Sequence, residues 1–315
     1  MVPLSNLVFE NAIKSAELSE GTKTSYLKQL RMALKYFGDS YSFILKHPFA
    51  VKKKLEDLVT KGTLSFNSAK SLVIVLISLF KHARNAKQLT MTKEAEELYV
   101  EWTQILNEYN LKSDLISEKN QFSEKELEGF VEFEEWKAKE KDLRSSEIGS
   151  LRHLLVAFHT LITPLRGGDL AVVRIVAPTS PMVKKSTDNI LVWAGEDKPS
   201  TLIIRDHKTR NKYPALKRDI PLVLRQAIAL SLKDEPRLYL FVDSRGLKWN
   251  RNSFMTWKSN TLKEIFNKPV TTNLARHAYV NATRSSADSL QDERTRADEM
   301  GHSLDMHQKY RRIQK

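Results

Sequence analysis

Five polar residues spread over the C-terminal half of the chain are of types that could act together on a phosphodiester. Each lies in a short polar stretch, and taken singly each stretch says little. In chain order the stretches are TPLRGGDL, DHKTRNK, TTNLARHAY, EMGHS and the closing GHSLDMHQKYRRIQK, which supply Arg166, Lys208, Arg276, His302 and Tyr310. The information lies in their order, which is arginine, lysine, arginine, histidine and then tyrosine.

Cleavage of a phosphodiester without a metal needs cationic donors for the non-bridging oxygens, a nucleophile and a proton source for the departing alkoxide. Arg166 and Arg276 suit the first task, because a planar guanidinium matches the geometry of a phosphate. Tyr310 could attack phosphorus and conserve the bond energy in a phosphotyrosine, so that no ATP would be needed. Lys208 could protonate the leaving 5′ oxygen, and His302 could hydrogen-bond the phosphate.

Each of these residues also has an ordinary structural interpretation. An isolated Arg-Gly-Gly is more often a loop than a phosphate site. His302 alone could be a surface or capping residue, and Tyr310 alone could be packing or decoration. Asp169 could serve only to orient the preceding arginine, and His153 and His159 lie in a mostly apolar segment where a structural role is expected.

Taken together, the motifs resemble the catalytic domain of the tyrosine recombinases and integrases, including those of phages and viruses. Upstream, TKTSYLKQL is similar to the T-x-x-x-Y-x-x-x-L opening of that family's helical core-binding domain, so the resemblance covers most of the chain. It implies a site-specific recombinase that cleaves and rejoins DNA through a 3′-phosphotyrosyl intermediate, with Tyr310 as nucleophile and no metal, ATP or other cofactor. It also implies double-stranded DNA as the partner and a homotetramer on paired recombination sites.

One position departs from the family pattern. A histidine usually stands three residues before the second arginine, whereas this chain has Asn273 there. Asparagine can donate a hydrogen bond to a phosphate, but it cannot accept a proton from Tyr310. Asn273 is therefore kept among the candidate site residues, with His277, His302 or a water left open as the proton acceptor. The eight residues from His302 to Tyr310 are also slightly fewer than in many members.

Two rival functions fit parts of the pattern. A type IB topoisomerase shares the same five residue types but relaxes DNA as a monomer at no specific site. A catalytically silent DNA-binding protein could have kept the fold, and the asparagine at position 273 gives this alternative some support. Retention of the other five positions favours the active enzyme.

Charge and composition agree with a nucleic-acid partner. Among 315 residues there are 51 Lys and Arg against 38 Asp and Glu, a formal net charge of +13. Such a balance suits a polyanion, because cations near phosphates release condensed counterions; an anionic membrane surface is the rival partner.

The absence of cysteine excludes disulfides and thiolate metal sites. A start without a basic n-region and an apolar run no longer than LVIVLISLF predict an intracellular, DNA-associated protein.

Helical periodicity dominates the first third of the chain, which is expected to form a core-binding domain over residues 1–115. No strand pattern occurs before residue 110. Helices are predicted at 22–37 with Thr22 as N-cap and Gly38 as its stop, at 51–60 before Gly62, at 67–84, and through TKEAEELYVEWTQILNEY. The polar stretch Asn110–Gln121 is read as a linker.

A catalytic domain is expected over residues 120–315. Ser123 and Glu126 have the form of a capping box at its first helix. LRHLLVAFHTLITPL predicts a buried helix broken near Pro164, and β-branched runs at 190–193 and 201–204 predict a small antiparallel sheet with a basic turn. The pattern is helical again from PLVLRQAIALSL to the end.

The expected fold is therefore mainly α with a small antiparallel β-sheet, as a two-domain clamp around DNA. An integrase of a virus or mobile element is the preferred biological role, because no extra N-terminal domain is evident and the asparagine departs from the usual pattern. The sequence does not indicate the target site, the host or the direction of recombination.

Overall fold

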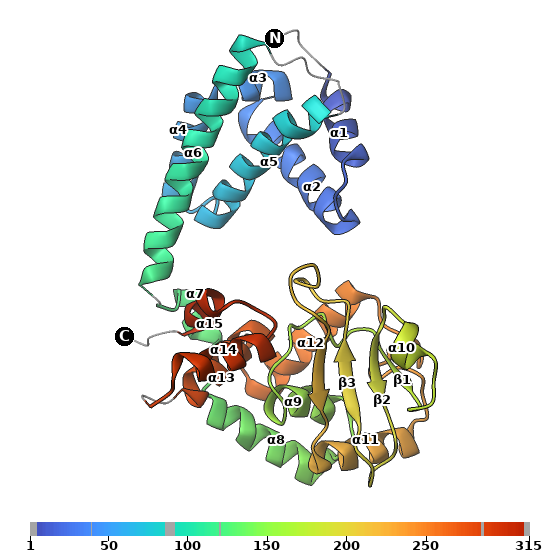
Figure 1. Ribbon diagram of the computed structural model, residues 1–315. Helices are drawn as coiled ribbons and strands as arrows, with labels where there is room; N and C mark the ends of the chain where they lie inside the picture. Colours follow the sequence, from blue (N-terminus) through green and yellow to red (C-terminus); the bar gives the residue numbers. More distant parts are fainter. Residues whose placement is uncertain (1–4, 39, 86–91, 120, 285–286, 312–315) are drawn as a thin grey trace. The chain divides into compact units, whose positions relative to one another are not determined.

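The computed structural model describes residues 5–38, 40–85, 92–119, 121–284 and 287–311. It divides into two compact units, Met1–Glu118 and Lys119–Lys315 (Figure 1). None of the described helices is long and apolar enough to cross a membrane.

The first unit contains helices only, within the residues that the structure describes. They are α1 Asn6–Ser15, α2 Glu20–Phe37, α3 Tyr41–Lys46, α4 Pro48–Thr60, α5 Phe66–Asn85 and α6 Lys93–Glu118. The apolar α5 packs against α1, α2, α4 and α6 and contributes buried residues such as Leu72 and Leu76. Trp102 of α6 is fully buried, and its Nε1 donates to the carbonyl of Leu45 at 3.0 Å, which ties α6 to α3.

Several predicted boundaries in this unit need correction. Helices α1 and α3 were not predicted. The N-cap of α2 is Ser19 rather than Thr22, because the Ser19 hydroxyl accepts from the Thr22 amide at 3.2 Å. Gly38 does end the helix, with a φ of 129° that favours glycine.

Most of the predicted linker is helical. Helix α6 continues to Glu118, so residues 110–118 of the stretch read as a linker belong to it. This segment has no glycine or proline to break a helix, and it contains good helix formers. Leu111, Leu115 and Ile116 are nevertheless exposed, so the helical unit buries no apolar face at the end of α6.

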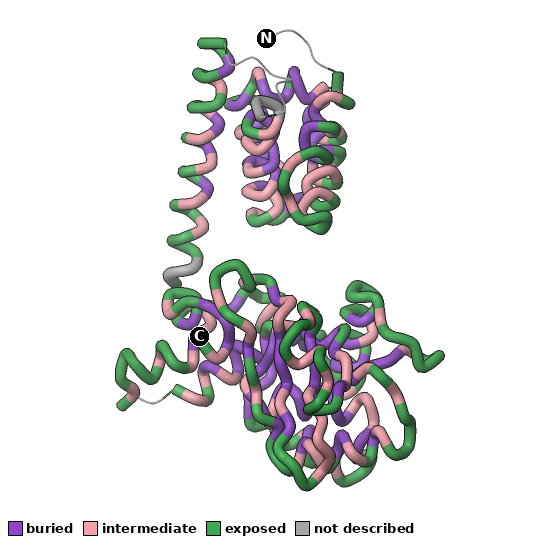
Figure 2. The backbone as a smooth tube through the Cα atoms, turned by 45° about the vertical axis from the view of Figure 1, so that its right-hand side comes forward, coloured by how far each residue is buried: buried purple, intermediate pink, exposed green. Residues whose placement is uncertain are grey.

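The second unit is larger and mixed. Its helices are α7 Glu124–Gly129, α8 Phe133–Glu147, α9 Leu151–Thr160, α10 Met182–Lys185, α11 Leu222–Asp234, α12 Arg251–Phe266, α13 Thr272–Thr283, α14 Leu290–Glu299 and α15 Leu304–Tyr310. The capping box of Ser123 and Glu126 is confirmed at α7. Helix α9 packs on α8 and α11 and is buried from His153 to His159. Figure 2 shows buried residues in the interior of this unit and exposed residues toward its outside.

Four strands form one sheet in the order β1-β2-β3-β4, with β1 Val173–Val176, β2 Asn189–Val192, β3 Thr201–Ile204 and β4 Leu216–Asp219. The two β-branched runs are confirmed as β2 and β3, but the sheet is mixed rather than antiparallel. Strands β1 and β2 are parallel, because the chain returns through α10 before β2 begins. The β3–β4 pair is the expected antiparallel hairpin, and its connection carries Lys208.

Candidate active site

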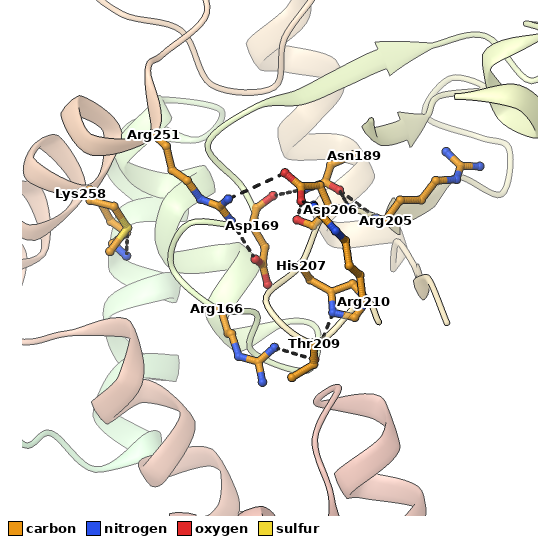
Figure 3. Close-up of polar contacts among 11 residues, drawn as sticks. Arg166, Asp169, Asn189, Arg205, Asp206, His207, Thr209, Arg210, Arg251 and Lys258 are labelled. Carbon is orange, nitrogen blue, oxygen red and sulfur yellow. Dashed lines mark hydrogen bonds and ion pairs between the residues drawn. The ribbon is translucent and has the colours of Figure 1, made fainter. Parts of the chain in front are cut away.

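Arg166 lies in the turn that follows α9 and joins three segments of the second unit. One terminal nitrogen donates to the Thr209 hydroxyl at 3.2 Å and the other to the Gly301 carbonyl at 3.3 Å. The Thr209 hydroxyl in turn donates to the same Gly301 carbonyl at 2.9 Å. Figure 3 shows Arg166 reaching toward Thr209 in the β3–β4 connection. This side chain is thus fixed beside both the hairpin and the segment that leads to His302.

Arg276 comes from α13 and is almost fully buried. Its terminal nitrogens donate to the carbonyls of Pro164 at 3.1 Å and Met300 at 3.2 Å, and to Nδ1 of His302 at 2.9 Å. Among the described residues its Nε has no hydrogen-bond partner. Burial lowers the pKa of Arg276, but a guanidinium stays charged in proteins. A buried cation with an unused donor is therefore present next to the turn that carries Arg166.

His302 is neutral at physiological pH. Because a guanidinium can only donate, Nδ1 of His302 must be the acceptor from Arg276. The hydrogen then sits on Nε2, which donates toward Nδ1 of His307 at 3.2 Å. Burial, followed by the charge of Arg276, lowers the pKa of His302 to about 3.

Tyr310, at the end of α15, lies among these groups. Its ring stacks on His302 with centroids 5.0 Å apart and an interplanar angle of 16°, and Cζ of Arg276 lies 4.9 Å from its centroid. The hydroxyl donates to Oδ1 of Asn273 at 3.1 Å. The structure thus brings together Arg276, His302 and Tyr310 with the asparagine that replaces the usual histidine.

A closed set of hydrogen bonds fixes the tyrosine. Nδ1 of His277 donates to the Tyr310 carbonyl at 2.6 Å, which leaves Nε2 of the neutral ring as an acceptor. That nitrogen receives the Asn273 amide at 3.3 Å, so the amide oxygen of Asn273 is turned toward the phenol. His277 therefore reaches the Tyr310 hydroxyl through Asn273, which accepts a hydrogen bond but not the proton.

Two predicted residues stand outside this group. Arg166 reaches it through the Gly301 carbonyl, next to His302, whereas Lys208 is joined to it by no hydrogen bond or ion pair among the described residues. The side chain of Lys208 is exposed and makes no hydrogen bond or ion pair with any described residue. Its neighbours are held firmly, with His207 Nε2 bonded to the Pro214 carbonyl at 3.2 Å. The base of the connection is held by Asn189, whose Oδ1 accepts from the amides of Arg205 and Asp206 at 2.8 and 2.7 Å. The Lys208 ammonium therefore has no described partner, although hydrogen bonds fix the backbone on both sides of it, next to Thr209.

Asp169 does not make a direct hydrogen bond to the Arg166 side chain. Its Oδ1 instead lies 3.5 Å from NH2 of Arg251 in α12, and Oδ2 has no partner among the described residues. Burial raises the pKa of Asp169, while the surrounding arginines oppose this shift. Figure 3 shows dashed lines from Arg251 to both Asp169 and Asp206. Asp169 therefore holds α12 to the turn.

His153 and His159 are confirmed as buried core residues. His153 Nε2 contacts Glu140 at 3.2 Å, and His159 Nδ1 bonds to the Leu155 carbonyl at 2.8 Å. Burial lowers the pKa of His159 to about 4.

Sequence reasoning missed Arg251 and Lys258, which α12 places against the Arg-Gly-Gly turn. A signal was present, because the two cations lie seven residues apart and so on one helix face. Within the described part of the chain, no His, Cys, Asp and Glu side chains are grouped so that they could hold a metal ion.

No protein-family model and no curated protein sequence matches the chain. Several solved structures are similar to it in fold. A lambda integrase dimer bound to a COC′ core site is similar with a TM-score of 0.60 at 13% identity, over 99% of this chain and 80% of that chain. A lambda integrase tetramer bound to a Holliday junction is similar with a TM-score of 0.57 at 13% identity, over 98% of this chain and 77% of that one. The chain has the fold of the tyrosine recombinases and integrases.

Proposed function

We propose that this protein is a site-specific DNA recombinase that cleaves and rejoins strands through a covalent bond between Tyr310 and a 3′ phosphate. The observation that carries the proposal is the packing of Tyr310 on His302 and Arg276, with its hydroxyl bonded to Asn273. Contact with a neutral histidine and a buried guanidinium supports a role for this tyrosine as a nucleophile rather than as a surface residue.

The reaction divides among residues of the second unit. The Tyr310 oxygen attacks phosphorus, the bond from phosphorus to the 5′ oxygen breaks, and Lys208 gives its proton to that oxygen. The phenol proton passes to a water, because Asn273 can accept a hydrogen bond from the phenol but cannot take its proton. Attack by the 5′ hydroxyl in the reverse direction rejoins the strand and frees Tyr310.

Charge stabilisation falls to the two arginines. The unpartnered Nε of Arg276 is available to a phosphate oxygen, and Arg166 would exchange its bonds to Thr209 and Gly301 for phosphate oxygens. Such donors are worth most in a buried site, where few waters compete. His302 would turn its Nε2 hydrogen from His307 to the phosphate.

Duplex DNA is the proposed partner. The net charge of +13 suits a polyanion, and the similar lambda integrase structures include a dimer on a core site and a tetramer on a Holliday junction. We assign the helical residues 1–115 to binding DNA and residues 120–315 to catalysis, with four copies acting on paired sites. Integration or excision of a viral or mobile element, within the host cell, is the process that fits this activity.

Covalent trapping tests the proposal without knowledge of the target sequence. The protein is incubated with a library of nicked duplexes of randomised sequence, in which the cleaved fragment diffuses away, and SDS-resistant adducts are recovered. We expect adducts that map to Tyr310 by peptide mass, enriched in one sequence. Tight binding without any adduct would instead favour the catalytically silent DNA-binding protein that Asn273 makes conceivable, and the proposal would fail. Relaxation of any supercoiled plasmid without sequence enrichment would point to a type IB topoisomerase.

A further inference from the structure

Helix α12 buries a lysine directly behind the turn that carries Arg166. Lys258 is only 2% exposed. Its Nζ donates to the Thr272 hydroxyl at 3.0 Å and lies 3.3 Å from the Met255 sulfur. Thr272 stands in the first turn of α13, immediately before Asn273. One ammonium therefore links α12 to the helix that carries the second arginine.

The Lys258 ammonium also lies in close contact with Gly167, the residue after Arg166. A Cβ built at Gly167 would lie 1.8 Å from Nζ of Lys258 and 2.5 Å from the Thr272 hydroxyl. Only glycine leaves room for this contact. The first glycine of the Arg-Gly-Gly motif is thus explained by a lysine that approaches the backbone from α12.

A charge at this position is costly. An ammonium has three donors, but among the described residues Lys258 has one strong acceptor, Thr272, and one weak acceptor, the Met255 sulfur. Methionine would fill a similar volume without loss of hydration. The ionisable groups that interact electrostatically with Lys258 are Asp169 from the turn and His159 from α9. Of these only Asp169 is acidic, and its Oδ1 is already shared with Arg251.

We propose that Lys258 is a positioning residue of the strand-cleavage site, whose protonated amine holds Arg166 and the first turn of α13 at a fixed separation and adds positive charge behind the phosphate. This inference rests on the proposed function. The two arginines come from different segments, and Lys258 is bonded to or packed against the residue next to Arg166 and the residue next to Asn273. In a low dielectric such a charge acts on a bound phosphate more strongly than a surface cation would.

The protonation of Lys258 should be visible in the pH dependence of cleavage and of stability. Burial lowers the pKa of Lys258 from 10.5 to about 8, while Asp169 opposes the shift. Cleavage that needs the protonated amine should fall as pH rises through about 8. Stability should change in the opposite sense. Between about pH 8 and 10.5 the unfolded chain binds more protons at this group than the folded chain, so the contribution of Lys258 to stability becomes more favourable as pH rises.

The test compares Lys258→Met with Lys263→Met, which makes the same substitution at an exposed position of the same helix. Single-turnover cleavage of the duplex recovered by trapping is measured from pH 6.5 to 9.5, together with DNA affinity and thermal unfolding. We expect Lys258→Met to cleave at least about tenfold more slowly than wild type near pH 7, with the gap closing above pH 8. Its DNA affinity should stay within about threefold, and its melting temperature should be unchanged or higher. Lys263→Met should match wild type throughout.

A cleavage ratio that does not vary with pH, or a loss of activity that only follows a lower melting temperature, would overturn the proposal. Should Lys258→Met not fold, the wild-type lysine is followed instead by NMR of its 13C-labelled side chain. A titration near 10.5 in the free protein, or no upward shift when a duplex of random sequence is added, would also overturn it. This measurement does not need cleavage, so the two proposals can fail separately. The absence of adducts would refute the proposed recombinase activity, whereas the titration of Lys258 alone would decide the proposal for that residue.

Discussion

The two units differ most in what they bury. Among the side chains described in the helical unit, no Asp, Glu, His, Lys or Arg is buried, and Ser42 is the one buried polar residue. The described side chains of the second unit include ten buried ionisable ones, namely Glu140, His153, His159, Asp169, His207, Lys258, Arg276, His277, His302 and His307. Most of them surround the Arg-Gly-Gly turn, α13 and the segment leading to Tyr310. Burial of ionisable groups costs free energy, so under the proposed function their concentration in the second unit is expected of the unit that carries the active site.

Tyr310→Phe should have the largest effect. The substitution removes one oxygen, leaves the ring stacked on His302, and deprives the proposed reaction of its nucleophile. We expect adducts to disappear while DNA affinity stays within about twofold, because the ring still packs. Tyr99→Phe makes the same change on α6 of the helical unit and should leave adduct formation intact. If Tyr310→Phe formed adducts at the wild-type rate, Tyr310 would not be the nucleophile, and the proposed division of roles between the two units would be wrong.

Lys208→Ala should slow cleavage by about 10²- to 10⁴-fold, the usual range for a lost general acid. Its exposed side chain makes no hydrogen bond or ion pair with a described residue, so unfolding and DNA affinity should barely change. A substrate with a 5′-thio leaving group needs no acid, and its cleavage should be restored toward the wild-type rate. If the thio substrate were cleaved as slowly as the normal one, Lys208 would not be the acid.

Asn273→His should change the rate less and in the other direction. The imidazole can accept the phenol proton that the amide cannot, so adduct formation should be equal to wild type or up to about tenfold faster. The measurement is the initial rate of adduct formation, with Asn281→His on the same helix as control. A clear loss of rate would mean that the asparagine's bonds to both His277 and Tyr310 matter more than a proton acceptor at this position.

Acid should affect the second unit more than the first. Burial lowers the pKa of His302 to about 3 and of His159 to about 4. Between those values and 6.5 the unfolded chain binds more protons, so their contribution to stability is present above about pH 6.5 and is lost as pH falls. Hydrogen exchange of the whole chain, corrected for intrinsic rates, should lose about tenfold more protection in α9 than in α5 between pH 7 and 5. Equal losses of protection in α9 and α5 would contradict this prediction. The pKa of partly buried His82 in α5 is also lowered, so acid should destabilise α5 to some extent and reduce the difference.

The order of residues along the chain selected the candidate residues better than any local pattern did. Arg166, Arg276, His302 and Tyr310 could be picked out because their types suit one reaction, and Asn273 because it stands where a histidine is expected. Lys258 could not be found in this way, because a lysine inside a helical pattern is normally a solvated residue. Its burial follows from the approach of α12 to Gly167, which is a tertiary contact.

Element boundaries show the same limit. The helices with clear apolar periodicity and the strands β2 and β3 were predicted, whereas the short α1 and α3 were not. The end of α6 is interpreted from the sequence as a linker because most of its residues are polar, although nothing in it breaks a helix. The parallel pairing of β1 was missed because a four-residue strand after a loop carries little pattern of its own.

The ring of hydrogen bonds from Tyr310 to Asn273, His277 and back to the Tyr310 carbonyl exists only while α15 is docked on α13. α15 has seven residues, and His307 is the one that it buries among those described. Docking of so small an element is an equilibrium, and each 1.4 kcal/mol changes the docked fraction about tenfold when that fraction is small. Under the proposed function the observed cleavage rate is the intrinsic rate multiplied by this fraction. Any ligand or partner copy that binds the docked form better than the undocked form would therefore raise activity without touching a reacting atom.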